Sequence, residues 1–224
     1  LAADGTPLPP KPRQVARPPY NGPPYDWREM SPGCQVLHLN TCEAAKKALD
    51  ALMSPSMPPV VGFDIEWRPS FIPKQPENPV ALVQISTYDT ILLLQLSSIQ
   101  AVPDSLWRIL ESPETTKVGV NIANDCIKLY RDWGLSVRNC IELSLMARSA
   151  DPSWTGKYNS PLGLAHLVEV YLERSLPKGH ISRSNWEDDP LSEKQKDYAA
   201  NDAHAGYMIY TKLASKITEM EPIP

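Results

Sequence analysis

Two carboxylates lie two residues apart in an otherwise apolar stretch, and together they could hold a metal ion. Residues 60–67 read VVGFDIEW, so Asp64 and Glu66 project from one side of a predicted strand whose other side is apolar. Like charges this close raise each other's pKa unless a cation or a hydrogen-bond donor compensates. Carboxylate oxygens suit hard divalent cations, so the pair favours a metal site.

Asp125 is a third candidate for the same kind of chemistry. It lies at the end of the sequence KVGVNIAND, where a predicted strand runs directly into a helix. In the first helical turn the helix dipole favours the ionised carboxylate. An aspartate that serves only helix stability is the alternative interpretation.

Tyr198 and Asp202 form a fourth feature, in the sequence YAANDA. Residues four apart lie one above the other on a helix face, so the phenol and the carboxylate point the same way. The positions around them are small, namely Ala199, Ala200, Ala203, Ala205 and Gly206. The backbone of this helix can therefore come close to the sheet and bring both groups to Asp64 and Glu66.

The surrounding pattern predicts the elements that position these residues. Strands are expected at 35–39, 60–67, 80–87, 90–96, 117–121 and 140–143, and helices at 41–51, 104–110, 123–133, 162–172 and 193–217. Ser192 and Gln195 have the spacing of a capping box before the last helix. Antiparallel strands, then strand–helix alternation, then terminal helices indicate an α/β fold with a mixed sheet flanked by helices.

Composition divides the chain near residue 33. Nine of the 24 prolines fall in residues 1–33, the proline-rich arm, which can form neither a helix nor an inner strand. It is predicted to be a linker; a docking site for a protein partner, or an arm lying across the domain through Tyr20, Tyr25 and Trp27, are the alternatives. Residues 34–224 are predicted to form one domain.

Charge and cysteine content narrow the function classes. With 22 Lys and Arg against 26 Asp and Glu, the net charge of −4 argues against the commonest basic nucleic-acid binders. The four cysteines lack zinc-ligand spacing and are interpreted as free thiols in a reducing, intracellular compartment. No apolar run is long enough for a membrane span, so no membrane association is expected. The chain begins with Leu1, so we expect a fragment.

Taken together, the motifs resemble those of the DEDD superfamily of 3′–5′ exonucleases. Asp64-x-Glu66, Asn121-x-x-x-Asp125 and Tyr198-x-x-x-Asp202 occur in the order and spacing of that superfamily. Tyrosine four positions before the last aspartate is typical of the tyrosine branch. Within this branch the chain is most similar to the Werner-type exonuclease domains, over residues 34–215 and especially in the Ser-Asn-Trp segment at 184–186.

This resemblance implies a ribonuclease H-like fold with five or six strands and two bound Mg²⁺ or Mn²⁺ ions. Asp64, Glu66 and Asp202 would hold one ion, and Asp64 with Asp125 the second. Tyr198 would orient the attacking water, because a phenol with a pKa near 10 is a poor base. Four of the negative charges would then be metal ligands, which reconciles the acidic chain with a nucleic-acid substrate.

Substrate contacts are expected from basic residues near the motifs. We predict phosphate binding by Lys178, His180 and Arg183, with Arg68 after the first motif; a solvated loop is the alternative. His204 and Trp186 are interpreted as structural residues.

The resemblance favours a DNA exonuclease that releases nucleoside monophosphates, with DNA repair as its setting. RNA 3′-end trimming of the ribonuclease D type is the alternative within enzymes, and a catalytically silent nucleic-acid-binding module is the alternative outside them. The nucleus is the expected location, with the mitochondrion as a second possibility.

Overall fold

The structure, a computed structural model, describes residues 20–72, 75–99, 101–154, 162–177 and 179–219. Its centre is a six-stranded sheet with the strand order β1-β4-β3-β2-β5-β6. The strands are β1 (Gln35–Leu39), β2 (Val60–Trp67), β3 (Val80–Ser86), β4 (Thr90–Gln95), β5 (Thr116–Gly119) and β6 (Cys140–Glu142). The predicted mixed α/β sheet is confirmed.

Both strand directions meet at β2. It pairs antiparallel with β3, which in turn pairs antiparallel with β4, while β5 pairs parallel with the other side of β2. The edge strands β1 and β6 are parallel to their neighbours β4 and β5. The strand that carries Asp64 and Glu66 is therefore held on both sides by backbone hydrogen bonds.

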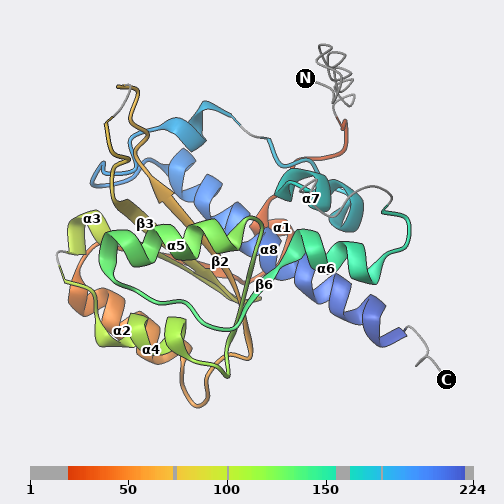
Figure 1. Cartoon of the computed structure of the whole chain (residues 1–224), viewed down its shortest axis with the longest axis horizontal. Helices are drawn as coiled ribbons and strands as arrows, with labels where there is room; N and C mark the ends of the chain where they lie inside the picture. The colour runs from red at the N-terminus through yellow and green to blue at the C-terminus, as the bar shows by residue number, and fades with distance from the viewer. Residues whose placement is uncertain (1–19, 73–74, 100, 155–161, 178, 220–224) are drawn as a thin grey trace, which may run out of the picture.

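Helices cover both faces of the sheet (Figure 1). One face packs on α2 (Cys42–Leu52), α4 (Asp104–Glu111) and α5 (Ile122–Trp133), and the other on α6 (Leu143–Ala150), α7 (Leu164–Leu172) and α8 (Glu193–Glu219). Alternate residues of β4 pack into the two apolar cores. Ile91 and Leu93 face α8, whereas Leu92 and Leu94 face the opposite core. Two apolar layers thus fix the plane of the sheet between them.

Three short helices were not among the predicted elements. They are α1 (Trp27–Met30), α3 (Leu96–Ile99) and α6. The predicted strand at 90–96 ends at Gln95 because Leu96 begins α3, and the predicted strand at 117–121 ends at Gly119. Asn121 adopts a left-handed conformation with φ 64° and forms the N-cap of α5, so it cannot extend the strand. No helix among the described residues is long and apolar enough to cross a membrane.

The described part of the proline-rich arm, residues 20–33, packs on the domain. It contains α1, so the expectation that the arm forms no helix is wrong for this part. Tyr25 and Trp27 are buried. The ring nitrogens of His204, a residue of α8, lie 2.6 Å from Tyr25 Oη and 3.0 Å from Ser31 Oγ. Burial lowers the pKa of His204 to about 4, so its ring is neutral at pH 7. His204, two residues after Asp202, therefore has a structural role, because it joins α8 to the arm.

Helix α8 comes very close to the sheet at Gly62 of β2. A methyl group added there would collide with the carbonyl oxygen of Ala203 in α8 and would lie 3.1 Å from the backbone nitrogen of Tyr207. Both neighbours are backbone atoms, which cannot rotate away. The small residues at this contact, Gly62 in β2 and Ala203 in α8, thus allow α8 to bring Tyr198 and Asp202 close to the strand.

We predict that Gly62→Ala lowers the free energy of unfolding by about 1–3 kcal/mol, the usual cost of overpacking a core. Gly206→Ala on α8 is the matched control, because its new methyl group would lie 3.6 Å from Val118 O, an ordinary contact. The control should be neutral or stabilising by up to about 1 kcal/mol, as expected for Gly→Ala inside a helix. Urea unfolding measures both, and equal stabilities for the two variants would contradict this packing.

Candidate active site

Three carboxylates from two distant segments meet on the α8 side of the sheet. Asp64 and Glu66 come from β2 and Asp202 comes from α8, and one oxygen from each lies within 4.8 Å of the others. All three side chains are half-buried. Such an all-oxygen cluster matches the donor set of Mg²⁺ or Mn²⁺, so the residues present fit a divalent ion.

These carboxylates line a cleft of about 430 Å³. Asp125 and Tyr198 line the same cleft, which places all five predicted catalytic residues in one cavity. Asp125 is outside the tight cluster of three, and it approaches from α5 at the other side of β2. The apolar walls include Phe63, Ile65, Val120, Leu162, Leu164 and Leu176. Acidic groups with apolar walls make a site that repels anions until a cation is present.

Burial and mutual repulsion raise the pKa of the cleft carboxyls. The pKa of Glu66 is raised well above its usual range, first by burial and then by the charges of Asp64, Asp202 and Asp125. The pKa of Asp125 is raised to about 8 by burial, by Asp64 and by Glu142. Without a cation the cleft therefore retains protons at neutral pH, and a bound divalent ion would have to displace them.

The ring of Tyr198 packs against the buried ring of Trp186. Their ring centroids are 6.0 Å apart, and Trp186 is fully buried, which agrees with its predicted packing role. Burial raises the pKa of the Tyr198 phenol, and the charges of Asp202, Glu66 and Asp64 raise it further. The phenol keeps its proton at any physiological pH, so it can donate a hydrogen bond but cannot act as a base.

The buried Gln195 connects the start of α8 to the Ser-Asn-Trp segment. Its Oε1 accepts hydrogen bonds from the backbone nitrogen and hydroxyl of Ser192, which confirms the predicted capping box. Its Nε2 donates to Ser184 Oγ at 3.1 Å and to Asn185 O at 2.9 Å. One side chain thus fixes the helix start relative to the residues that lead to Trp186.

The position of Asp125 depends on how α5 begins. Glu142, at the end of β6, accepts a hydrogen bond from the backbone nitrogen of Ile122 at 3.1 Å and another from that of Ser144 at 3.2 Å. One carboxylate therefore caps the starts of both α5 and α6. Since strand β5 reaches α5 through the left-handed Asn121, the turn points Asp125 into the cleft.

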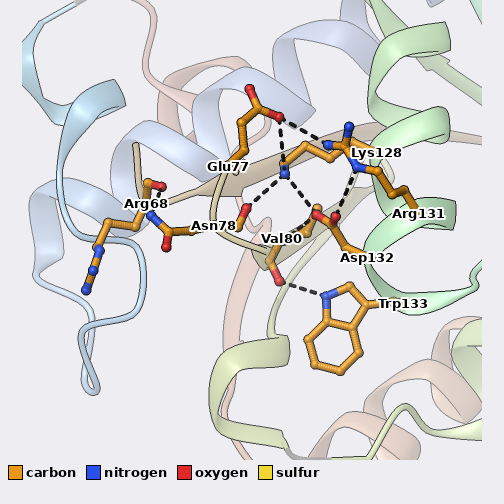
Figure 2. A network of polar contacts seen from close by, with 8 residues as sticks. All are labelled: Arg68, Glu77, Asn78, Val80, Lys128, Arg131, Asp132 and Trp133. Carbon is orange, nitrogen blue, oxygen red and sulfur yellow. Dashed lines mark hydrogen bonds and ion pairs between the residues drawn. The ribbon is translucent and has the colours of Figure 1, made fainter. Parts of the chain in front are cut away.

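A buried ion pair fastens the middle of α5 to the segment that follows β2 (Figure 2). Lys128 Nζ lies 2.8 Å from Asp132 Oδ2, donates to Asn78 O at 2.9 Å and lies 4.7 Å from the ring centre of Trp67. Asp132 also accepts from the backbone nitrogen of Val80, and Asn78 donates to the carbonyl of Arg68. Because Trp67 and Arg68 follow Glu66 directly, the network holds α5 and the end of β2 at a fixed separation.

The predicted substrate-binding residues do not all lie together. Arg68 and Arg183, 115 positions apart by their numbers, line a second cleft of about 330 Å³ with Phe71 and Ile72, whereas His180 lines neither cleft. His180 is exposed in the short helical turn η1 (His180–Arg183). Lys178 lies outside the described residues. Arg68 also forms an ion pair with Glu187 at 3.0 Å.

Known proteins share this arrangement of sequence and fold. The sequence pattern of the 3′–5′ exonuclease family matches residues 38–218. The chain belongs to this family. It is 37% identical over 174 residues to a 3′–5′ exonuclease of Arabidopsis thaliana, covering 75% of this chain and 57% of that protein. It is 34% identical over 189 residues to the bifunctional 3′–5′ exonuclease/ATP-dependent helicase WRN of Mus musculus, covering 82% and 13%.

The chain is thus a 3′–5′ exonuclease domain that spans about half of the Arabidopsis relative and a small part of WRN. Escherichia coli RNase D superposes with a TM-score of 0.68 at 23% identity, over 82% of this chain and 45% of that one. The catalytic core of RRP6 from Trypanosoma brucei gives 0.69 at 19%, over 83% and 48%. These likenesses confirm the predicted ribonuclease H-like fold.

The exonuclease domain also contains a buried polar residue that motif reasoning missed. Gln84 of β3 lies directly across from Asp64 in the strand register and is fully buried. Neither its Oε1 nor its Nε2 has a hydrogen-bond partner among the described residues. An unpaired buried amide costs about 1–3 kcal/mol. A single polar residue inside the apolar run at 80–85 was the available signal for Gln84.

The raised pKa of Asp125 predicts a pH-dependent stability. A carboxyl group with a higher pKa in the folded protein than its unfolded value of about 3.9 stabilises the fold below that unfolded pKa and loses the contribution as pH rises through about 8. We therefore expect the Tm in EDTA to fall between pH 5.5 and 8.5, and to fall less in Asp125→Asn.

Mg²⁺ should raise the wild-type Tm more at pH 8.5 than at pH 5.5, because protons compete with the ion for these oxygens. Scanning calorimetry measures each of these Tm values. A metal-free Tm that falls equally in wild type and variant would contradict the assignment of the shift to Asp125.

Proposed function

We propose that this domain hydrolyses DNA from its 3′ end with two divalent ions, releasing nucleoside monophosphates. The observation that carries the proposal is the gathering of Asp64, Glu66, Asp125, Tyr198 and Asp202 in one cleft. These residues lie on three elements, and a purely structural role would not gather four carboxylates where burial and mutual repulsion make their charges costly. The family membership supplies the reaction class.

The donor set supports Mg²⁺ or Mn²⁺. Asp64, Glu66 and Asp202 would hold one ion, since their oxygens already lie within 4.8 Å of one another. Asp64 with Asp125 would hold the second, on the α5 side of β2. Two such ions would supply positive charge for the attacking and leaving oxygens of a phosphodiester.

The residues of the chain then position the reactants. The Tyr198 hydroxyl, which stays protonated, donates a hydrogen bond that orients the attacking water. The water oxygen forms a bond to phosphorus while the bond from phosphorus to the 3′ oxygen breaks, leaving a 3′-hydroxyl on the shortened strand and a nucleoside 5′-monophosphate. Trp186 holds the phenol ring in place through their packing.

The substrate strand would continue from the catalytic cleft into the second cleft. Arg68 and Arg183 offer two guanidinium groups to phosphates there, and Phe71, 77% exposed, offers a ring to a base. The network around Lys128 and Asn78 supports this role for Arg68, because it fixes the backbone from which Arg68 projects. His180 and Lys178 are proposed as outer phosphate contacts from the same loop.

We propose DNA as the preferred substrate because the chain resembles WRN more closely in sequence than it resembles RNase D. The mouse WRN protein is 34% identical, whereas RNase D of Escherichia coli is 23% identical. RNA is the second candidate, supported by the good superposition on RNase D and on the RRP6 core.

Asp202→Asn should reduce Mn²⁺-dependent 3′–5′ degradation at least about 100-fold without lowering the Tm, because the change removes charge from a repulsive cluster. Tyr198→Phe should lower turnover strongly while the affinity for Mn²⁺ is retained. Asp197→Asn is the matched control: this exposed aspartate of α8 pairs with Arg28 at 2.6 Å, away from the cleft, and should change the rate less than twofold. Full activity in Asp202→Asn would refute the proposed site.

Matched assays on 3′-recessed double-stranded DNA and on single-stranded RNA decide the substrate. We expect the DNA to be shortened at least tenfold faster, with nucleoside 5′-monophosphates as products on chromatography. Faster digestion of the RNA would favour trimming of the ribonuclease D type. Absence of hydrolysis with both Mg²⁺ and Mn²⁺, despite binding of either nucleic acid, would favour a silent binding module.

A further inference from the structure

A pair of thiols lies beside the predicted metal ligand Asp125. Cys126 of α5 and Cys140 of β6 are 14 positions apart, and their sulfur atoms are 3.6 Å from each other. Both are free thiols. A disulfide bond is about 2.05 Å long, so closing it requires the sulfurs to approach by only about 1.5 Å. No other sulfur pair within hydrogen-bonding distance occurs among the described cysteines.

The two thiols differ in their access to solvent. Cys140 is exposed and Cys126 is half-buried, so a small oxidant can reach Cys140 first. The pKa of Cys140 is lowered to about 7, because it shares a hydrogen bond with Cys126 and the Lys117 ammonium lies nearby. This asymmetry is typical of an attacking and a resolving cysteine.

Lys117 contributes a buried positive charge to this corner of the fold. It pairs with Cys140 in the register of β5 and β6, and its Nζ donates to the carbonyls of Ser112 at 2.9 Å and Thr115 at 2.8 Å. These hydrogen bonds hold the ammonium group in place. The positive charge beside Cys140 is thus fixed by the sheet and its neighbouring carbonyls, and does not depend on a surface lysine.

We propose that Cys126 and Cys140 are a reversible dithiol site for hydroperoxides. The Cys140 thiolate attacks one peroxide oxygen and breaks the O–O bond, giving a sulfenic acid and hydroxide or an alcohol. The Cys126 sulfur then attacks the sulfenic sulfur, forming the disulfide and releasing water. The pair loses two electrons and two protons, and the peroxide is reduced. A thiol reductant reverses the reaction.

The disulfide would move a residue of the cleft. Cys126 directly follows Asp125 in the first turns of α5, and Glu142 of β6 already hydrogen-bonds to the first backbone nitrogen of α5. Pulling Cys126 toward β6 therefore shifts Asp125 relative to Asp64. A displacement of about 1 Å can cost about 100-fold in rate, so oxidation lowers nuclease activity. This consequence rests on the proposed function, whereas formation of the bond does not.

The bond is tested by treating the metal-free and Mg²⁺-loaded protein with hydrogen peroxide, followed by alkylation and peptide mass spectrometry. We expect a Cys126–Cys140 crosslinked peptide, a mass loss of two hydrogens and full return of both thiols with dithiothreitol. Cys140→Ser and Cys126→Ser should each abolish the crosslink, whereas Cys34→Ser and Cys42→Ser, at the other two free cysteines, should leave it unchanged. Alkylation of both Cys126 and Cys140 after peroxide would overturn the proposal.

Activity is measured on the same samples. Oxidised wild type should be at least about tenfold slower, and dithiothreitol should restore it, whereas Cys140→Ser should keep its rate in peroxide. A crosslinked protein with unchanged rate would overturn the link to Asp125. Inactivity of the reduced protein would instead refute the proposed function and leave the crosslink as a separate result.

Discussion

The contact between the backbone of α8 and the backbone of β2 is the constraint on which the site depends. Gly62 supplies the space on the strand, and the alanines of α8 supply it on the helix. At a wider separation of helix and sheet, short side chains from the two elements could not share one ion. The small residues therefore sacrifice apolar contact area so that Asp202 can reach Asp64 and Glu66.

This proximity makes the carboxylates repel one another, and the packing of the rest of the domain has to offset that repulsion. The raised pKa values of Glu66 and Asp125 reflect this repulsion together with burial. Apolar packing on both faces of the sheet holds the carboxylates together despite the repulsion. Several polar groups outside the cluster orient the elements that carry it. Glu142 fixes the start of α5, Lys128 fixes its middle, and Gln195 fixes the start of α8.

Sequence reasoning found the six strands and the five cleft residues because both follow local rules. Alternation of apolar residues defines β2, and the spacing of Tyr198 and Asp202 defines a helix face. Sequence-based prediction failed where the structure depends on contacts between residues far apart in the chain. The short helix α1 forms because Trp27 is buried and its backbone nitrogen donates to Asn201, and the partnership of Arg68 with Arg183 depends on loops that no periodicity describes. The lack of a hydrogen-bond partner for the Gln84 amide among the described residues likewise can be seen only in the structure.

The hydrogen bond between Tyr25 and His204 joins residues 179 positions apart, and it has a consequence for how the domain assembles. Contacts of such sequence separation form late, since the chain must first pay the entropy of closing a long loop. During synthesis the strand with Asp64 leaves the ribosome well before α8. A chain without α8 therefore carries Asp64 and Glu66 but lacks Asp202, and the acidic cluster is complete only when the whole domain has folded.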